Sequence, residues 1–330
     1  MAKLVPEGHP ERGPAQQEVE RCNQLLALDQ QLSGILQGNE PPNHAAELLA
    51  LADLCLRNKH FYAAATRFYA AALEKEPQLA EDVRANVYYD AACAASSAAI
   101  GKGNDADKFQ EQDRTKLRRQ ARDWLHDDLA VRRKQSQSDN VEEVVLVTDH
   151  LSHAQGDPDF AGVREAGELA GLPEEEREHW QRLWTEQAQL LKETTARFMI
   201  TQHEGTLTGR ETQQIHELTM LAGKSYVVDL ESLQFDAYLR VVDGTGKVLT
   251  ENDDISSENV NSRVIFSANH TGVYRRRHLA ASTRHRSLHA HDPRICRTVS
   301  IERRFAEESS AIVDFAGKGL AQWGNKFAEA

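Results

Sequence analysis

Hydrophobic side chains recur every three to four residues from about Gln16 to Lys192, which is the period of amphipathic helices. The first stripe ends near Gly38 and consists of Leu25, Leu26, Leu28, Leu32, Ile35 and Leu36. The same period predicts a second helix over 44–58 and a third over 62–75, which ends before Pro77. The larger, N-terminal part of the chain is therefore predicted to be helical.

The turn between the second and third predicted helices is short, running from Arg57 to His60. A connection of this length forces the two helices to pack antiparallel. Small side chains at Ala52, Ala65 and Ala72 would let the two backbones approach closely.

The third predicted helix carries aromatic residues and alanines at a recognisable spacing: Tyr62, Ala65, Tyr69, Ala72 and Pro77. This order resembles the second helix of the tetratricopeptide repeat. Leu49 and Asp53 stand where the first helix of that repeat has Trp and Gly. The resemblance implies a stack of helix pairs, in which each pair buries the apolar face of its neighbour.

Further helices continue this pattern. Segment 88–93 resembles the first helix of a second repeat, with 115–131 as its partner and a polar insertion over 101–113 between them. Two more helices are predicted over 139–152 and 173–192. Two or three irregular repeats of this kind would form a short superhelical stack.

After Thr194 the hydrophobic period changes from helical to alternating. Short alternating segments, separated by turns that contain Gly and Asp, lie at 215–218, 226–230, 237–242, 248–249 and 263–266. Short strands at such spacing are typical of an antiparallel β-sandwich.

The order of motifs from Leu221 to Tyr274 resembles the bacterial pre-peptidase C-terminal domain. The matching motifs are Gly223-Lys224, Tyr226–Leu230, Phe235–Arg240, Gly246-Lys247, Asn252–Asp254 and Gly272-Val273-Tyr274. The resemblance implies a jelly-roll-like sandwich over 204–274. Together with the helical repeats, it is similar to the C-terminal interaction regions of large bacterial signalling and repeat proteins, some of which begin with a serine/threonine kinase domain.

Three consecutive arginines, Arg275 to Arg277, follow where the resembled family has further strands rich in Val, Leu and Thr. Consecutive arginines cannot alternate between a core and solvent. Residues 275–304 hold nine Arg against two acidic residues, although the whole chain has a net charge of −12. We therefore predict an irregular, basic tail over 275–330. Two explanations stay open: a reading-frame shift near Tyr274, or a native basic segment that binds an acidic partner.

The overall charge and the apolar segments exclude several classes of protein. A net charge of −12 argues against nucleic-acid binding, which needs cations to displace counterions from phosphates. The longest weakly charged stretch, 85–101, is rich in Ala and too short to span a bilayer. The N-terminus has no apolar signal-peptide core, which favours the cytoplasm, whereas the resembled β family is usually found outside it. The compartment stays open.

No catalytic motif stands out, and we expect no enzymatic activity and no cofactor. The segment Asp159-Phe160-Ala161-Gly162 has one Ala too many for the metal-binding motif of kinases, and the other kinase motifs are missing. Hard oxygen ligands cluster near a turn as weak calcium candidates: Asp243, Asn252, Asp253 and Asp254. A solvated acidic loop is the alternative interpretation.

The helical repeats carry the candidates for partner binding, because the resembled repeat family binds extended peptides or partner proteins on its concave face. The polar candidates for that face are Asn86, Tyr89, Asp90, Arg118, Arg119 and Arg122. Ordinary solvated residues would have the same pattern.

The sequence as a whole predicts an α+β multidomain protein: a disordered leader over 1–15, a helical repeat domain over 16–195, a β-sandwich over 204–274 and the basic tail. The predicted function is a non-catalytic protein-interaction or scaffold module with an accessory sandwich. One alternative is the detached C-terminal region of a bacterial serine/threonine kinase. The other is the accessory chain of a secreted peptidase or hydrolase.

The reading-frame hypothesis makes a direct prediction about the gene. Translation of the other two frames downstream of the codon for Tyr274 should give alternating Val, Leu and Thr followed by a stop. If neither frame does so, the basic segment is native and the hypothesis is wrong.

Overall fold

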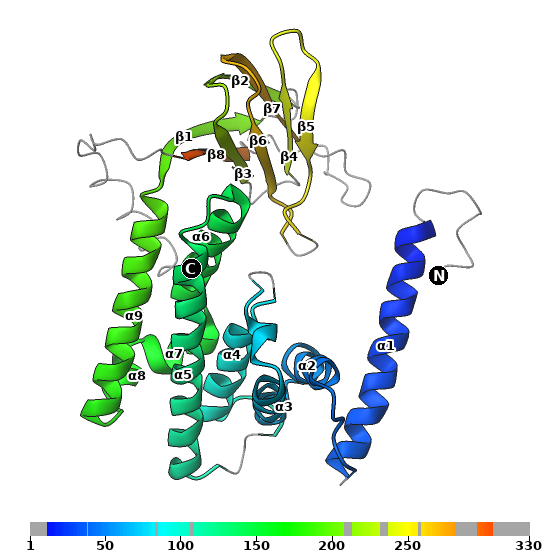
Figure 1. Cartoon of the computed structure of the whole chain (residues 1–330), viewed down its shortest axis with the longest axis vertical. Coiled ribbons are helices and arrows are strands. Elements are labelled where there is room, and N and C mark those ends of the chain that lie inside the picture. Colours follow the sequence, from blue (N-terminus) through cyan, green and yellow to red (C-terminus); the bar gives the residue numbers. More distant parts are fainter. Residues whose placement is uncertain are drawn as a thin grey trace. The chain divides into compact units, whose positions relative to one another are not determined.

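The computed structural model describes residues 12–37, 39–82, 85–105, 109–207, 213–231, 237–256, 259–280 and 296–305. The chain divides into two compact units: residues 1–138 and 143–191 form the first, and residues 139–142 and 192–330 form the second. Helices make up the first unit, and antiparallel sheets make up the second (Figure 1). The predicted order of a helical part followed by a β part is confirmed.

Long helices and short helical turns form the first part of the chain (Figure 1). The long helices are α1 (Arg12–Leu36), α2 (Ala45–Asp53), α3 (Tyr62–Lys75), α4 (Val87–Ala99), α5 (Glu111–Gln135), α6 (Val141–Gly156) and α9 (Glu174–Thr195). The short ones are the π-helical turn η2 (Leu54–Lys59), the 3₁₀ turns η3 (Pro77–Ala80) and η4 (Pro158–Phe160), and α7 (Ala161–Arg164) and α8 (Ala166–Leu169).

Helix α1 begins at Arg12, within the segment that was predicted to be a disordered leader. Pro14 lies in its first turn, where a backbone N–H has no helical partner in any case. The remainder of that segment, 1–11, lies outside the described residues. Leu32 is buried, whereas Leu26 is exposed. The C-terminal half of α1 therefore supplies its packing against the helical core.

Helices α2 and α3 pack against each other as the first pair. The predicted helix over 44–58 is α2 continued by η2, and the chain then turns at His60, whose φ of 54° is left-handed. Ala52, Ala65 and Ala72 are buried within the pair. Side chains without bulk at these positions permit the close approach that the short turn demands.

Side chains of α2–η2 contact α4, and side chains of α4 contact α6; we call α2–η2, α4 and α6 the first-helix layer. Arg57 on η2 donates a hydrogen bond to Asp90 on α4 over 2.7 Å. The Tyr89 ring on α4 meets the edge of the His150 ring on α6, with centroids 4.6 Å apart. Contacts between polar and aromatic side chains thus connect neighbours that are far apart in the sequence.

The polar insertion after α4 folds back over the turn between α2 and α3. Asp105 accepts hydrogen bonds from the backbone N–H groups of Ala63 and Ala64, over 3.1 and 2.8 Å, and so caps the first turn of α3. Gly103 has a φ of 90°, and a Cβ there would lie 2.5 Å from the carbonyl oxygen of His60. The loop can therefore approach the turn this closely only with glycine.

Two four-stranded antiparallel sheets form the second unit, in the orders β1-β8-β3-β6 and β2-β7-β4-β5. The strands are β1 (Phe198–Leu207), β2 (Gln213–Met220), β3 (Ser225–Glu231), β4 (Ala237–Val242), β5 (Val248–Asn252), β6 (Ser262–Ser267), β7 (Gly272–Ala280) and β8 (Cys296–Phe305). β1 begins before residue 204, where the β domain was predicted to start.

One hydrophobic core contains side chains from both sheets, including Met220, Val228, Leu239 and Tyr274. Asp229 is also buried, in the middle of β3. Its carboxylate pairs with Arg263, the residue directly opposite on β6. A buried carboxylate needs such a partner, because an unpaired one would cost several kcal/mol.

The sheets continue beyond Tyr274, where an irregular tail was predicted. β7 includes Arg275 to Arg277 and pairs with β2 on one side and β4 on the other. β8 lies between β1 and β3. Ladder hydrogen bonds come from backbone atoms, so a strand can form without a strict alternation of side chains. Segments 281–295 and 306–330 of the predicted tail lie outside the described residues.

We predict that the loop over the first turn is a measurable source of stability. Asp105→Ala removes the cap of α3 and should lower the free energy of unfolding of the helical unit by about 1 kcal/mol. Gly103→Ala forces a Cβ against His60 and should lower the free energy of unfolding at least as much as Asp105→Ala does. Urea unfolding followed by circular dichroism at 222 nm measures both.

Gly167→Ala in α8 is the matched control, since no atom lies within 4 Å of the added Cβ. It should leave the stability unchanged or slightly higher, because alanine favours helix over glycine. Equal losses in all three variants would contradict a specific role for the loop.

Candidate functional site

A buried carboxylate, Asp157, joins α4 to the turn that follows α6. Its Oδ2 accepts a hydrogen bond from the Tyr89 hydroxyl over 2.6 Å and lies 3.4 Å from His153 Nε2. Its Oδ1 accepts the backbone N–H of Asp159 over 2.8 Å and so caps η4. Cys93 Sγ lies 3.9 Å from Oδ2. We call Tyr89, Cys93, His153, Asp157 and Asp159 the Asp157 cluster.

The contacts of this cluster keep Asp157 ionised. Burial on its own would raise the pKa of Asp157, but hydrogen bonds from His153, Tyr89 and the Asp159 backbone lower that pKa to about 2. The same contacts, led by the hydrogen bond with Asp157, raise the pKa of His153. At neutral pH the cluster therefore holds a charged carboxylate inside the helical unit.

A second buried chain of polar contacts runs from α6 through α5 to the start of α4. Asp128 accepts from His150 Nε2 over 2.8 Å and from Arg132 Nε over 3.2 Å. Arg132 in turn donates to the Asn86 side chain over 2.6 Å. These contacts fix α5 against both of its first-layer neighbours.

The space between these polar chains is almost filled. A cavity of about 10 Å³ is lined by residues from α4, α5, α6 and α9, among them Tyr89, Asp128 and Gln187. A cavity of that volume holds about one water molecule. The buried polar side chains therefore serve packing between helices, and this cavity has no room for a larger ligand.

Charged groups reach the surface of the first-helix layer at a third cluster. Tyr69 donates to Asp53 over 2.5 Å, and Arg57 donates to Asp90 over 2.7 Å. The Arg57 side chain is 60% exposed, whereas that of Asp90 is 14% exposed. We call Asp53, Arg57, Tyr69 and Asp90 the Asp90 cluster.

The residues of the repeat signature lie in the first helix pair. Ala65, Tyr69 and Ala72 are buried, with exposed fractions of 1% or less. Tyr62 is half-buried at the start of α3, and Pro77 begins η3. Ala65, Tyr69 and Ala72 thus face the core of the helical unit, and Tyr69 in addition donates a hydrogen bond to Asp53.

The six candidates for partner binding separate into two groups. Asn86 and Asp90, spaced by one helical turn, are half-buried on the first-helix layer, whereas Tyr89 between them is buried. The others lie on α5. Arg118 is buried against Glu176 of α9, over 2.6 Å, and Arg122 lies 3.3 Å from His179 of the same helix.

Burial corrects the expectation that Tyr89 and Arg118 lie on a partner-facing surface. The Tyr89 hydroxyl is used by Asp157, and the Arg118 guanidinium binds Glu176 and Glu111. Arg119 is exposed on α5. Of the six, Asn86 and Asp90 combine a fixed position with access from solvent on the first-helix layer.

The calcium candidates form local hydrogen bonds in turns and between strands. Asp243 Oδ1 accepts hydrogen bonds from the Thr245 backbone and hydroxyl, over 2.8 and 2.6 Å, and from the Lys247 backbone. Asn252 Nδ2 donates to the backbone carbonyls of Asp254 and Arg263. Asp253 Oδ1 accepts from the Asp254 backbone N–H. Within the described ranges, no three His, Cys, Asp or Glu side chains are grouped so that they could hold a metal ion.

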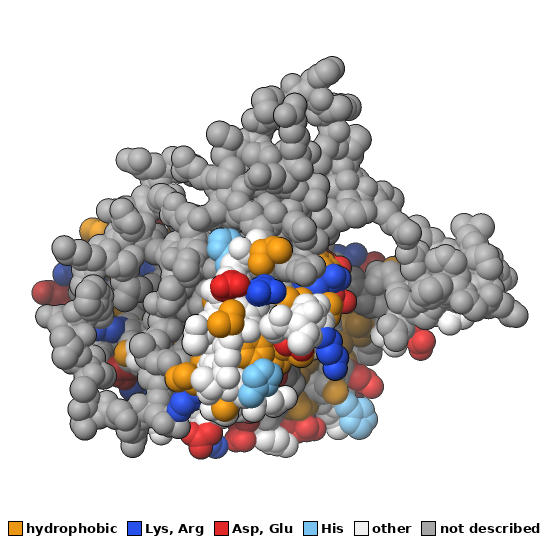
Figure 2. All heavy atoms as spheres, turned by 90° about the horizontal axis from the view of Figure 1, so that it is seen from above, with side chains coloured by type: hydrophobic (Ala, Val, Ile, Leu, Met, Phe, Trp, Pro, Cys, Tyr) orange, Lys and Arg blue, Asp and Glu red, His pale blue; other side chains and the backbone are white. Residues whose placement is uncertain are grey.

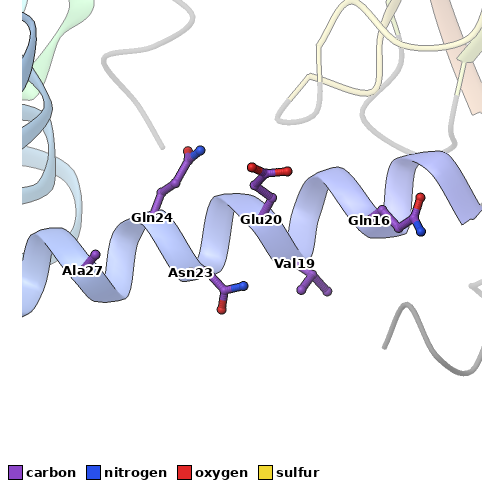
Figure 3. Close-up of a pocket in the computed structure, with 6 residues that line it drawn as sticks. All are labelled: Gln16, Val19, Glu20, Asn23, Gln24 and Ala27. Carbon is purple, nitrogen blue, oxygen red and sulfur yellow. The ribbon is translucent and has the colours of Figure 1, made fainter.

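The surface adds two further observations. A hollow of about 480 Å³ beside α1 is lined by residues of that one helix. Figure 3 shows Glu20 and Gln24 pointing to one side of the helix, and Val19 and Asn23 pointing to the other. On the face that Figure 2 shows, hydrophobic side chains lie interspersed with charged ones and with histidines. Neither view shows walls that converge on a ligand.

Sequence reasoning missed most of the residues that build these clusters: Asp53, Arg57, Asp128, His150, His153 and Asp157. Asp157 lies in a segment that reads as a turn and helix cap, and it does cap η4. No pattern along the chain pairs it with Tyr89, which is 68 residues away. Its second role is therefore visible only in three dimensions.

Comparisons with known proteins do not show which family this chain belongs to. No family model matches it, and no curated protein matches it. One similar solved structure is the Aeromonas hydrophila PliG, a periplasmic lysozyme inhibitor of g-type lysozyme. It is 13% identical with a TM-score of 0.24, and the match covers 32% of this chain and 87% of that one. None of the described helices is long and apolar enough to cross a membrane.

We predict that Asp157→Asn weakens the helical unit in a pH-dependent way. Because the folded-state pKa of Asp157 is depressed to about 2, its ionised form stabilises the fold above pH 4, and that contribution disappears as the pH falls towards 2. The free energy of unfolding of the variant should be about 2 kcal/mol lower than that of the parent near neutral pH. Urea unfolding followed by tryptophan fluorescence, across this pH range, measures the loss.

Asp123→Asn is the control for loss of one carboxylate. Asp123 pairs with Arg122, and its side chain is 54% exposed. Exposed pairs contribute about 0–1 kcal/mol, so this variant should stay close to the parent at every pH. If Asp157→Asn were still less stable than the parent at low pH, loss of the ionised carboxylate would not explain the lower stability.

Proposed function

We propose that this chain is a protein-interaction module that binds an extended peptide segment of its partner along the first-helix layer. The observation that carries the proposal is the Arg57–Asp90 contact, which fixes two charged side chains across neighbouring first helices. Asn86 lies one turn before Asp90 and is held by Arg132. Side chains that are already ordered lose little entropy when they bind.

The finer description of the fold belongs to the same proposal. We infer a tetratricopeptide-like stack because the buried signature residues Ala65, Tyr69 and Ala72 lie in an antiparallel pair followed by further pairs. We infer a jelly-roll-like sandwich, of the pre-peptidase C-terminal type, because both four-stranded sheets contribute to one core. In this proposal the sandwich is an accessory or targeting module, and catalysis is not part of the function.

An extended peptide suits this layer for a physical reason. Its backbone offers N–H and C=O groups that no helix or sheet of its own has used, and these can pair with ordered polar side chains. The exposed part of Arg57 and the amide of Asn86 provide both donors and acceptors. Recognition would then combine backbone hydrogen bonds with whichever side chains the partner presents between them.

Selection from a library of unstructured peptides, using the full chain as bait, tests the proposal. The affinity of selected peptides is then measured by fluorescence anisotropy for the parent and for Arg57→Ala and Asn86→Ala. We expect each substitution to weaken binding about tenfold, the typical effect of a central contact. Circular dichroism confirms that the variants fold.

Arg182→Ala provides the matched control, since Arg182 is an exposed arginine on α9 and outside the first-helix layer. Its removal should leave the affinity unchanged. Failure to select any peptide would overturn the proposal, as would peptides whose affinity depends on Arg182 as much as on Arg57.

A further inference from the structure

The Asp90 cluster presents two carboxylates to a single guanidinium. Asp53 accepts its hydrogen bond from Tyr69 over 2.5 Å, and Asp90 accepts from Arg57 over 2.7 Å. Both carboxylates interact electrostatically with Arg57. With both acids ionised, the cluster carries one negative charge more than its cation balances.

We propose that Asp90 takes up a proton in mildly acidic solution and thereby releases Arg57, so that the peptide-binding face responds to pH. The regulatory role rests on the function proposed above, whereas the protonation itself does not. A negative charge on Asp90 is disfavoured by its burial and by the neighbouring carboxylate of Asp53, and the largely exposed Arg57 opposes both effects only in part. Of the two, Asp90 is the one whose side chain lies mostly out of solvent at this surface.

The surroundings of Asp90 act in the same direction. Burial is the largest of the causes that raise the pKa of Asp90 to about 6; the charges of Asp53 and Asp128 act in the same direction, and Arg57 opposes them. Asp90 in turn contributes to raising the pKa values of Tyr69 on α3, Cys93 on α4 and His153 on α6. These are the charged and titratable groups that face it from α2–η2, α3, α4, α5 and α6.

Proton uptake changes what the face offers to a partner. The summed charge of Asp53, Arg57 and Asp90 goes from −1 to 0, because arginine stays protonated throughout. Neutral Asp90 loses the charge that holds Arg57, and the guanidinium becomes available for a carboxylate of the partner. Acidic peptides should therefore bind more tightly in mild acid than at neutral pH, and basic peptides less tightly.

Nuclear magnetic resonance on the isotopically labelled full chain tests the proton uptake directly. The side-chain carboxyl ¹³C signal of Asp90, assigned by its loss in Asp90→Asn, is followed as the pH is raised. We expect a midpoint of about 6 and a shift of the Arg57 Nε–H signal with the same midpoint. A midpoint near the ordinary pKa of aspartate would overturn the proposal. So would an Arg57 Nε–H signal that does not change when Asp90 titrates.

Two further variants keep the test decisive. Arg57→Gln removes the cation that opposes protonation, so the midpoint of Asp90 should rise; an unchanged or lower midpoint contradicts the shared-cation geometry. Asp29→Asn removes a carboxylate that pairs with Lys59, over 2.7 Å, instead of with Arg57. This variant should leave the titration midpoint of Asp90 unchanged. A shift as large as that in Arg57→Gln would mean that the net charge of the chain, and not the contact with Arg57, sets the midpoint.

Peptide binding is a separate readout. Selected acidic peptides should gain about threefold in affinity between neutral and mildly acidic solution, and Asp90→Asn should remove that dependence. If no peptide binds while Asp90 still titrates as expected, the proposed function fails and the proton uptake stands. If peptides bind without pH dependence, the regulation fails and the proposed function stands.

Discussion

The contact between Asp157 and Tyr89 is the interaction on which the helical unit depends. Asp157 immediately follows α6, so fixing it fixes where that helix ends relative to α4. A buried carboxylate is tolerated only with hydrogen-bond donors around it, and the Tyr89 hydroxyl and the Asp159 backbone are such donors. Because α4 is held in this way, Asp90, which directly follows Tyr89, can lie next to Arg57. The surface geometry thus follows from a buried contact.

Local pattern predicted the helices and the small buried residues. The third predicted helix coincides with α3, and the alanines Ala65 and Ala72 are buried as their spacing requires. Helix periodicity depends on neighbours three and four residues away, so a single sequence contains that information. The Arg57–Asp90 pair joins residues 33 positions apart, and no local period encodes which arginine meets which acid. Tyr89 shows the same limit, because an amphipathic pattern does not reveal a buried hydroxyl partner.

The sheets show where side-chain alternation succeeds and where it fails. Segment 226–230, predicted as an alternating strand, forms β3, but all five of its residues are buried, and the strand has neighbours on both sides. β1 and β8 have mixed polar and apolar sequences, and neither was predicted. Arg275 to Arg277 have no apolar alternation, yet their backbones pair with β2 and β4. Alternation reports how side chains are divided between core and solvent, whereas strand pairing requires only the backbone.

The polar contact between Arg57 on η2 and Asp90 on α4 has a consequence for the proposed binding. An apolar contact would hold α2–η2 and α4 together at any pH and would leave the surface charge alone. The Arg57–Asp90 pair connects the two helices and also sets the charge of the first-helix layer. A partner that draws Arg57 away leaves Asp90 largely buried and without its cation, which favours a proton on that carboxylate. In the proposed function, partner binding and proton binding are then linked, and by reciprocity each changes the affinity of the other by the same factor.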